Sequence, residues 1–232
     1  MRYIIAIMLI LLLISGCNSS SSNSDTSVSS ETPTVLIQTE LPTPTILINT
    51  PIQQINNAVD ANKDDTKKAI KELSDKVVDY LNKKDMNKLS GNVHPEKGVR
   101  FSQYGRVHIK EHKNFKAEQV KVLLNDTKKY VWGAYEGSGD NIELTPKEYL
   151  EKFVFNKSYE TAKFSYNEKL SQSGYSDDFQ ETVYPNSIMT EYYFKGKDPD
   201  VGGLDWTSLR FIFDLYKDNW YLVGIISNQQ TF

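Results

Sequence analysis

One short segment gathers the residue types of acid–base chemistry. His94 is followed two positions later by Glu96, and Arg100 comes four residues after that. An imidazole, a carboxyl group and a guanidinium in one turn-rich loop could act as general acid or base and orient an anionic substrate. Tyr192 and Asp205 could complete such a site from the second half of the chain. The alternative is that His94 braces its loop while Arg100 pairs with a nearby carboxylate.

The other two histidines offer a weaker pattern. His108 and His112 stand four residues apart, and Glu111 lies between them. Their order is not the His-Glu-x-x-His pattern of zinc proteases, and the neighbouring lysines would repel a cation. We therefore expect no metal site here, but a solvated strand end and loop.

Motifs of other reaction types do not occur in the chain. There is no Gly-x-Ser-x-Gly elbow, phosphate-binding loop or dinucleotide fingerprint. The formal net charge is -3, and charges of both signs are interspersed rather than gathered in a basic stripe. Because nucleic-acid binding depends on such a stripe, we expect no nucleic-acid role. Because the binding motifs named above are missing, we also expect no cofactor. Several aromatics could line a cavity or a sugar platform, but are more often core residues (Trp132, Tyr135, Trp206, Trp220, Tyr221).

The single cysteine lies directly after a hydrophobic leader. Arg2 supplies a positive charge, residues 3–13 are almost entirely apolar, and small residues precede Cys17. This is the layout of a secretory signal peptide. A membrane-spanning helix needs about 20 apolar residues, and this run is shorter and lacks stop-transfer charges.

The sequence Ile14-Ser15-Gly16-Cys17 resembles the lipobox of bacterial lipoproteins. The resemblance implies that residues 1–16 are removed and that the Cys17 thiol is joined to diacylglycerol. Two fatty chains, such as palmitate, would make anchoring stable, whereas one chain binds only marginally. The expected location is the extracytoplasmic face of the cell membrane, and a secreted form without lipid is the alternative.

The rest of the chain divides into a tether and one folded domain. Residues 17–59 are rich in Ser, Thr and Pro, a composition typical of a flexible linker. They contain two apolar patches, at 35–37 and 46–48, whose role the sequence does not indicate. Residues 60–232 carry periodic apolar patterns and are expected to form a single domain.

The first half of this domain is expected to be mainly helical. Apolar residues at spacings of three and four predict a helix from Asp64 to about Leu81, and Asp85 predicts an N-cap for a short helix that ends at Gly91. Short strands are predicted at 107–110 and 121–124, and a longer one at 129–135. Thr145-Pro146-Lys147-Glu148 is a capping box that predicts a helix to about Phe155.

The last third alternates with period two. The segments 188–194 and 209–216 predict strands, and Lys217-Asp218-Asn219 predicts a tight turn into a third strand from Trp220. The expected fold class is α+β, with N-terminal helices packed on a curved C-terminal antiparallel sheet of the cystatin-like or cone type.

This order of elements over residues 64–232 is similar to the nuclear-transport-factor-2-like superfamily, in which a bent sheet wraps helices around an apolar cavity. Two segments, 93–102 and 205–210, look like parts of uncharacterised lipoproteins of Gram-positive bacteria. Neither resemblance carries a set of catalytic residues over to this chain.

Three functions follow as hypotheses. The first is a lipid-anchored, non-catalytic domain that binds a small amphipathic ligand, an envelope component or a protein partner. The second is a cone-fold lyase or isomerase that uses His94 as general acid or base and Arg100 to orient the substrate. The third is a structural adaptor that forms a homodimer through an open face of its sheet.

Overall fold

The computed structural model describes residues 52–171 and 180–230, all within one compact unit, and no side chains before residue 63 or at 180 and 181. The expected leader, the lipobox with Cys17 and both apolar patches of the tether lie outside the described residues. Among the described residues, no helix has the length and hydrophobicity to cross a membrane.

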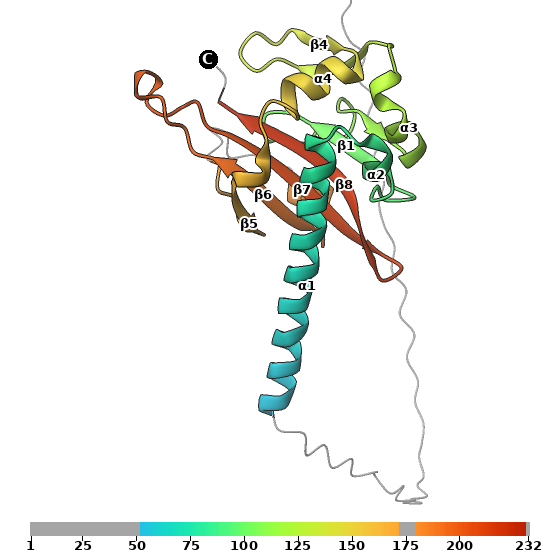
Figure 1. The fold of residues 1–232 in the computed structure, drawn as a ribbon, viewed down its shortest axis with the longest axis vertical. Helices are drawn as coiled ribbons and strands as arrows, with labels where there is room; N and C mark the ends of the chain where they lie inside the picture. The colour runs from blue at the N-terminus through green and yellow to red at the C-terminus, as the bar shows by residue number, and fades with distance from the viewer. Residues whose placement is uncertain (1–51, 172–179, 231–232) are drawn as a thin grey trace, which may run out of the picture. The chain divides into compact units, whose positions relative to one another are not determined.

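The longest element is helix α1 (Ile52–Asn82), which lies across one face of a large sheet (Figure 1). It begins inside the segment that the sequence assigns to the tether, so residues 52–59 are helical. The predicted apolar face is confirmed, because Ile70, Val77 and Leu81 are all buried. Its C-terminal half is therefore held by packing against the sheet rather than by helix propensity alone.

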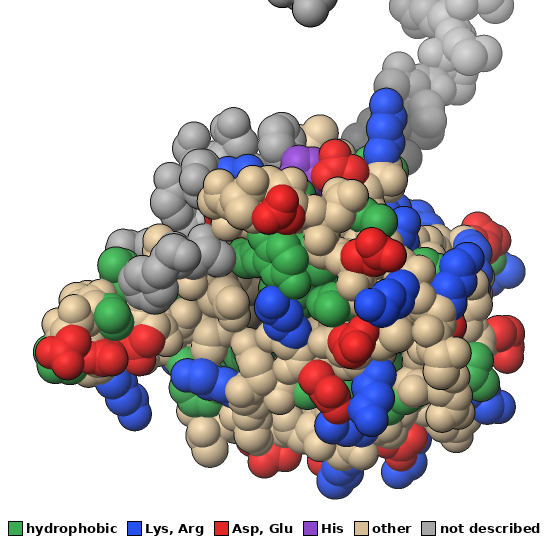
Figure 2. All heavy atoms as spheres, turned by 90° about the horizontal axis from the view of Figure 1, so that it is seen from above, with side chains coloured by type: hydrophobic (Ala, Val, Ile, Leu, Met, Phe, Trp, Pro, Cys, Tyr) green, Lys and Arg blue, Asp and Glu red, His purple; other side chains and the backbone are tan. Residues whose placement is uncertain are grey.

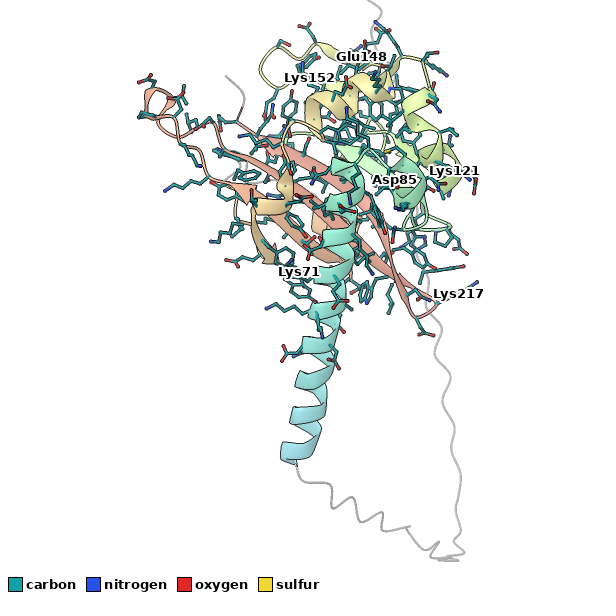
Figure 3. The ribbon with its side chains drawn as sticks, in the orientation of Figure 1. Lys71, Asp85, Lys121, Glu148, Lys152 and Lys217 are labelled. Atoms are coloured by element: carbon teal, nitrogen blue, oxygen red, sulfur yellow. The ribbon has the colours of Figure 1, made fainter. Side chains whose placement is uncertain are left out.

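The two predicted capping motifs are confirmed. Asp85 accepts a hydrogen bond from the backbone N–H of Lys88 at the start of α2 (Met86–Ser90) (Figure 3). Thr145 and Glu148 form a reciprocal capping box at the start of α4 (Pro146–Phe153). In both cases the side chain satisfies a backbone donor that the helix itself leaves without a partner.

Six strands form a single sheet in the order β2-β1-β8-β7-β6-β5. All neighbouring pairs are antiparallel except β1 and β8, which are parallel. The α+β class and the predicted hairpin at 217–219 are thus confirmed. The strands are β1 (Val99–Ser102), β2 (Asn114–Phe115), β5 (Lys163–Tyr166), β6 (Ile188–Phe194), β7 (Thr207–Tyr216) and β8 (Asn219–Gln229).

Two of the short predicted strands are wrong. Residues 107–110 belong to a loop with turns, and residues 121–124 belong to α3 (Ala117–Lys121) and a 3-10 turn (Leu123–Asn125). Short apolar runs do not distinguish a strand from a helical turn. Here the helical turn is favoured because the Gln119 side chain accepts from the Lys116 N–H and so caps α3. The third prediction is confirmed as β3 (Tyr130–Ala134), which pairs with β4 (Asn141–Leu144) in a separate hairpin.

Short elements complete the connections. A 3-10 turn (Tyr159–Thr161) precedes β5, and helix α5 (Gln180–Val183) precedes β6. A further 3-10 turn (Pro199–Val201) lies between β6 and β7. The main core lies between one face of the sheet, the helices and the β3–β4 hairpin. Its largest fully buried apolar side chains are aromatic (Trp132, Tyr149, Tyr159, Phe101, Phe153, Phe211, Phe213).

The opposite face of the sheet is also buried, which the sequence did not predict. Met189, Ile212 and Ile226 on this face form a second apolar cluster with Val107 and Val223, and Val183 and Tyr184 pack against it. The loop 103–112 and the segment before β6 therefore cover it. The adaptor hypothesis rested on an open sheet face, and the described residues do not leave this one open.

The same face contains a buried ion pair. Arg210 Nε lies 2.9 Å from Glu191 Oε1, and the two side chains are only 1% and 0% exposed. Ser171 donates to Glu191 through its hydroxyl and its backbone N–H. Burial alone would raise the pKa of Glu191, but Arg210 and the hydroxyl donors outweigh it and hold the pKa below the usual value.

Removing Arg210 should therefore destabilise the domain strongly. We expect Arg210→Met to lower the free energy of unfolding by about 3–5 kcal/mol, because Glu191 would remain buried without its counter-ion. Urea unfolding of the variant and of the wild-type chain at pH 7 measures the difference. Lys83→Met is the control, since it removes an exposed ion pair with Asp79 and should change stability little. Equal stability of the two variants would contradict this account of the pair.

Candidate functional site

The structure gives His94 the role of a brace. Its Nδ1 accepts hydrogen bonds from the backbone N–H groups of Glu96, at 3.1 Å, and Lys97, at 3.0 Å. The ring is buried and packs against Tyr216 and Tyr221 at centroid distances of 5.0 and 5.9 Å. Burial lowers the pKa of His94, so the neutral ring that accepts these two bonds is favoured.

The other three candidate residues lie elsewhere. Arg100 donates to the carbonyls of Ile109, at 3.0 Å, and His112, at 2.6 Å. Tyr192 projects from the opposite face of the sheet, where its hydroxyl donates to a carboxylate oxygen of Asp75 on α1 at 2.6 Å.

Asp205 lies in the loop between β6 and β7. It accepts from the backbone N–H groups of Lys197, at 2.8 Å, and Asp198, at 3.1 Å, and these bonds lower its pKa. The structure therefore does not bring His94, Arg100, Tyr192 and Asp205 to one cavity. Each of them instead holds a different part of the fold.

A polar cavity of about 180 Å³ lies between the loop 103–112 and the end of strand β3. Neither the loop nor the strand predicts this cavity alone, because its walls come from segments that are distant in the sequence. We call it the polar pocket. It is lined by Gln103, Tyr104, Arg106, His108, Glu111, His112, Ala134, Tyr135 and Glu136.

Gln103 forms part of the floor of the polar pocket and has a fixed orientation. The residue is 3% exposed. Its Nε2 donates to the carbonyl of Trp132 at 3.2 Å, and its Oε1 accepts from the hydroxyl of Tyr149 at 3.2 Å. Exchanging the oxygen and nitrogen of the amide would lose the bond to the Trp132 carbonyl. The amide nitrogen therefore lies on the side of Trp132 and His112, and the oxygen on the side of Tyr149.

His112 completes the floor and contradicts our expectation of a solvated loop, because it is only 5% exposed. Its Nδ1 lies 2.9 Å from Ser102 Oγ and accepts from the backbone N–H of His108 at 3.2 Å. Burial, together with His108 and Arg100, lowers the pKa of His112 to about 3. The ring is therefore neutral at physiological pH, and a backbone donor at Nδ1 places its single hydrogen on Nε2.

The floor thus presents two donors to the same place. His112 Nε2 lies 3.3 Å from Gln103 Nε2, and both atoms carry hydrogen. Among the described residues, the one hydrogen-bond contact of His112 Nε2 is the one with Gln103 Nε2. With the hydrogen of His112 on Nε2, this contact joins two donors, so the described residues supply no acceptor for that hydrogen, and buried donors normally have one.

Two backbone features shape this floor. Gly133 has φ +132°, and a Cβ atom there would lie 2.4 Å from Gln103 Nε2, so only glycine fits beside the amide. Tyr104 has φ 59°, in the left-handed region that non-glycine residues rarely adopt. Such conformations persist where the surrounding structure imposes them, and they are concentrated at functional sites.

The rim of the polar pocket carries tyrosines and charges of both signs. Burial raises the pKa of Tyr104 to about 12, with contributions from Tyr135 and Glu136. Tyr135 accepts a hydrogen bond from Lys152 of α4 at 3.1 Å. Arg106, Glu111 and Glu136 supply one positive and two negative groups. Charges of both signs, with hydrophobic side chains between them, are spread over the face seen in Figure 2.

A second cavity, of about 210 Å³, lies beside α3. Its walls are mostly apolar and include Phe115, Val122 and Leu123. Its lining has a single charged residue, Asp126, whereas the lining of the polar pocket includes two histidines and charges of both signs. The polar pocket is therefore the better candidate for recognising a ligand.

The sequence favoured His94 and predicted a solvated strand end and loop for His108 and His112, whereas these two histidines line the polar pocket. No group of three or more His, Cys, Asp or Glu residues in the described part of the chain could hold a metal ion. Of the aromatics considered for a binding platform, Trp132 and Trp206 are buried, whereas Tyr135 lines the polar pocket. Comparison with protein families, with curated proteins and with solved structures found no match to this chain.

Replacing His94 should reveal its bracing role. His94→Leu leaves the two backbone N–H groups of its turn without an acceptor, and we expect a loss of about 1–3 kcal/mol in the free energy of unfolding. His94→Asn supplies an oxygen close to the position of Nδ1 and should recover part of that loss. Chemical unfolding of both variants is the measurement, and a Leu variant as stable as the wild type would rule out the brace.

Proposed function

We propose that this protein is a lipid-anchored extracytoplasmic lipoprotein whose folded domain binds a small molecule in the polar pocket. The observation that carries the proposal is the pair of buried N–H donors on the floor, Gln103 Nε2 and His112 Nε2, that face one space. Buried donors are normally paired, so a ligand that brings an acceptor would complete the site.

Binding without catalysis is favoured by the state of His112. An efficient general acid or base has a pKa close to the working pH, whereas the pKa of His112 is about 3. Its Nδ1 is also occupied by Ser102 and the backbone of His108, which fixes the ring as a donor. The lyase or isomerase hypothesis required His94 and Arg100 to share a site, and both instead bond to backbone groups.

The cone-type fold and the relation to the nuclear-transport-factor-2-like superfamily remain part of this proposal. They are supported by the placement of α1 against the face of the sheet that carries Thr190 and Tyr192, with α2 packed on α1 and α3 (Figure 1). Lipid anchoring is supported by Ile14-Ser15-Gly16-Cys17 alone.

Lipidation predicts a specific labelling result. In a bacterium that expresses the full chain, a palmitate analogue should label the wild-type protein, and the mature product should begin at Cys17. Cys17→Ser removes the thiol and should give an unlabelled protein that retains its leader. Gel fluorescence and N-terminal mass spectrometry measure both effects. A wild-type product without label would overturn the anchor.

The polar pocket predicts that ligand binding can be blocked from its rim. Ala134 is exposed and lines the polar pocket, so Ala134→Trp should fill the entrance without disturbing the core. We expect it to abolish the binding of small polar compounds that a ligand-detected NMR screen finds for the full chain in detergent. Val131→Trp, on the same strand but outside the polar pocket, is the control. Hits that survive Ala134→Trp would place binding elsewhere.

A further inference from the structure

We infer that the ligand of the polar pocket is a small zwitterion of the amino-acid type, with its carboxylate on the floor and its ammonium group at the rim. The inference rests on the proposed function, because it names the ligand class for the same site. Three properties of the polar pocket support it: the donors on its floor, the charges at its rim and its size.

The floor requires an acceptor oxygen. Gln103 and His112 both present N–H groups, 3.3 Å apart and almost fully buried, so a single oxygen could accept from both. Hydrogen bonds from neutral donors to a carboxylate are stronger than those to a neutral carbonyl. Because His112 is neutral from about pH 4 upward, it offers this hydrogen bond without adding a charge of its own.

The rim favours a positive group on the same ligand. Glu111 and Glu136 bring two carboxylates to the walls, against the single guanidinium of Arg106. The carboxylate of Glu111 would attract an ammonium group on the ligand and oppose a second negative charge. Glu111 is exposed, so it lies where such a group would contact solvent.

The volume limits the ligand to a few atoms. A cavity of 150 Å³ can hold benzene, so about 180 Å³ accommodates roughly six to ten non-hydrogen atoms. Free amino acids from alanine to glutamate fall in this range, whereas disaccharides and drug-sized ligands need more room. Donors on the floor, an exposed acid among the lining residues and a small volume together fit an α-amino acid better than a sugar.

The inference is tested with fragments of the ligand. We would titrate the full chain in detergent with L-alanine, propionate and ethylamine, and record binding by calorimetry and by shifts of the Gly133 and Ala134 amide signals. L-alanine should bind at least tenfold more tightly than either fragment. Propionate that binds as tightly as L-alanine would overturn the inference, because the ammonium group would then contribute nothing.

Variants assign the two ends of the ligand. Glu111→Gln should weaken L-alanine severalfold and leave propionate unchanged or tighter, whereas Glu118→Gln, an exposed acid on α3 outside the polar pocket, should change neither. Gln103→Glu replaces a donor with an acceptor and should weaken both carboxylates at least tenfold. His112→Asn keeps an acceptor for Ser102 but removes the Nε2 donor, and it gives the same test if Gln103→Glu does not fold.

The two proposals fail in different ways. Suppose that no amino acid binds, but that other compounds bind to the wild-type chain and not to Ala134→Trp. The polar pocket is then a binding site, and the zwitterion inference is wrong. If no compound in the screen binds at all, the proposed function is wrong as well. Equal effects of Glu111→Gln on L-alanine and propionate would also reject the assignment of the ammonium group to the rim.

Discussion

The guanidinium of Arg100 ties the loop 103–112 to the sheet, and much of the molecule depends on this contact. It bonds to the carbonyls of Ile109 and His112, at opposite ends of a turn that has no secondary structure of its own. A loop of this kind costs conformational entropy to fix, and charge-assisted hydrogen bonds from a buried strand can supply the compensation.

Two consequences follow from the fixed loop. It places Val107 against Met189 and Ile212, so that the second face of the sheet is shielded from water. It also places His112 beside Gln103, which builds the floor of the polar pocket. The covering of the sheet and the formation of the pocket are therefore not independent features. A residue that the sequence suggested as a substrate-orienting group is instead a structural support for a different site.

Local patterns in the sequence predicted local structure well. The caps at Asp85 and Thr145 and the hairpin at 217–219 depend on residues within a few positions of each other, and all three are confirmed. Alternation in β7 also predicted the strand, but it did not predict that Arg210 and Ile212, on the second face of the sheet, are fully buried. Alternation reports one buried face, and it does not indicate that a distant loop covers the other.

The polar pocket could not be predicted for the same reason. Its floor depends on Arg100, Ser102 and the backbone of His108 holding one imidazole in one tautomer, and on a glycine in β3 that leaves space beside it. Neighbouring lysines in the sequence suggested a solvated His112, yet the fold turns this side chain inward. Burial of a single polar side chain is a property of tertiary contacts that periodicity does not encode.

The parallel pairing of β1 with β8 has a consequence for the order of assembly. Arg100 is registered against Gly224, so the strand that carries it can join the sheet only after the last part of the chain is available. Contacts between such distant segments form slowly, because a long loop must close first. A nascent or C-terminally truncated chain would thus lack the strand that pairs with β1, and with it the surface on which Arg100 fastens the loop. The polar pocket would form only once synthesis of the whole polypeptide is complete.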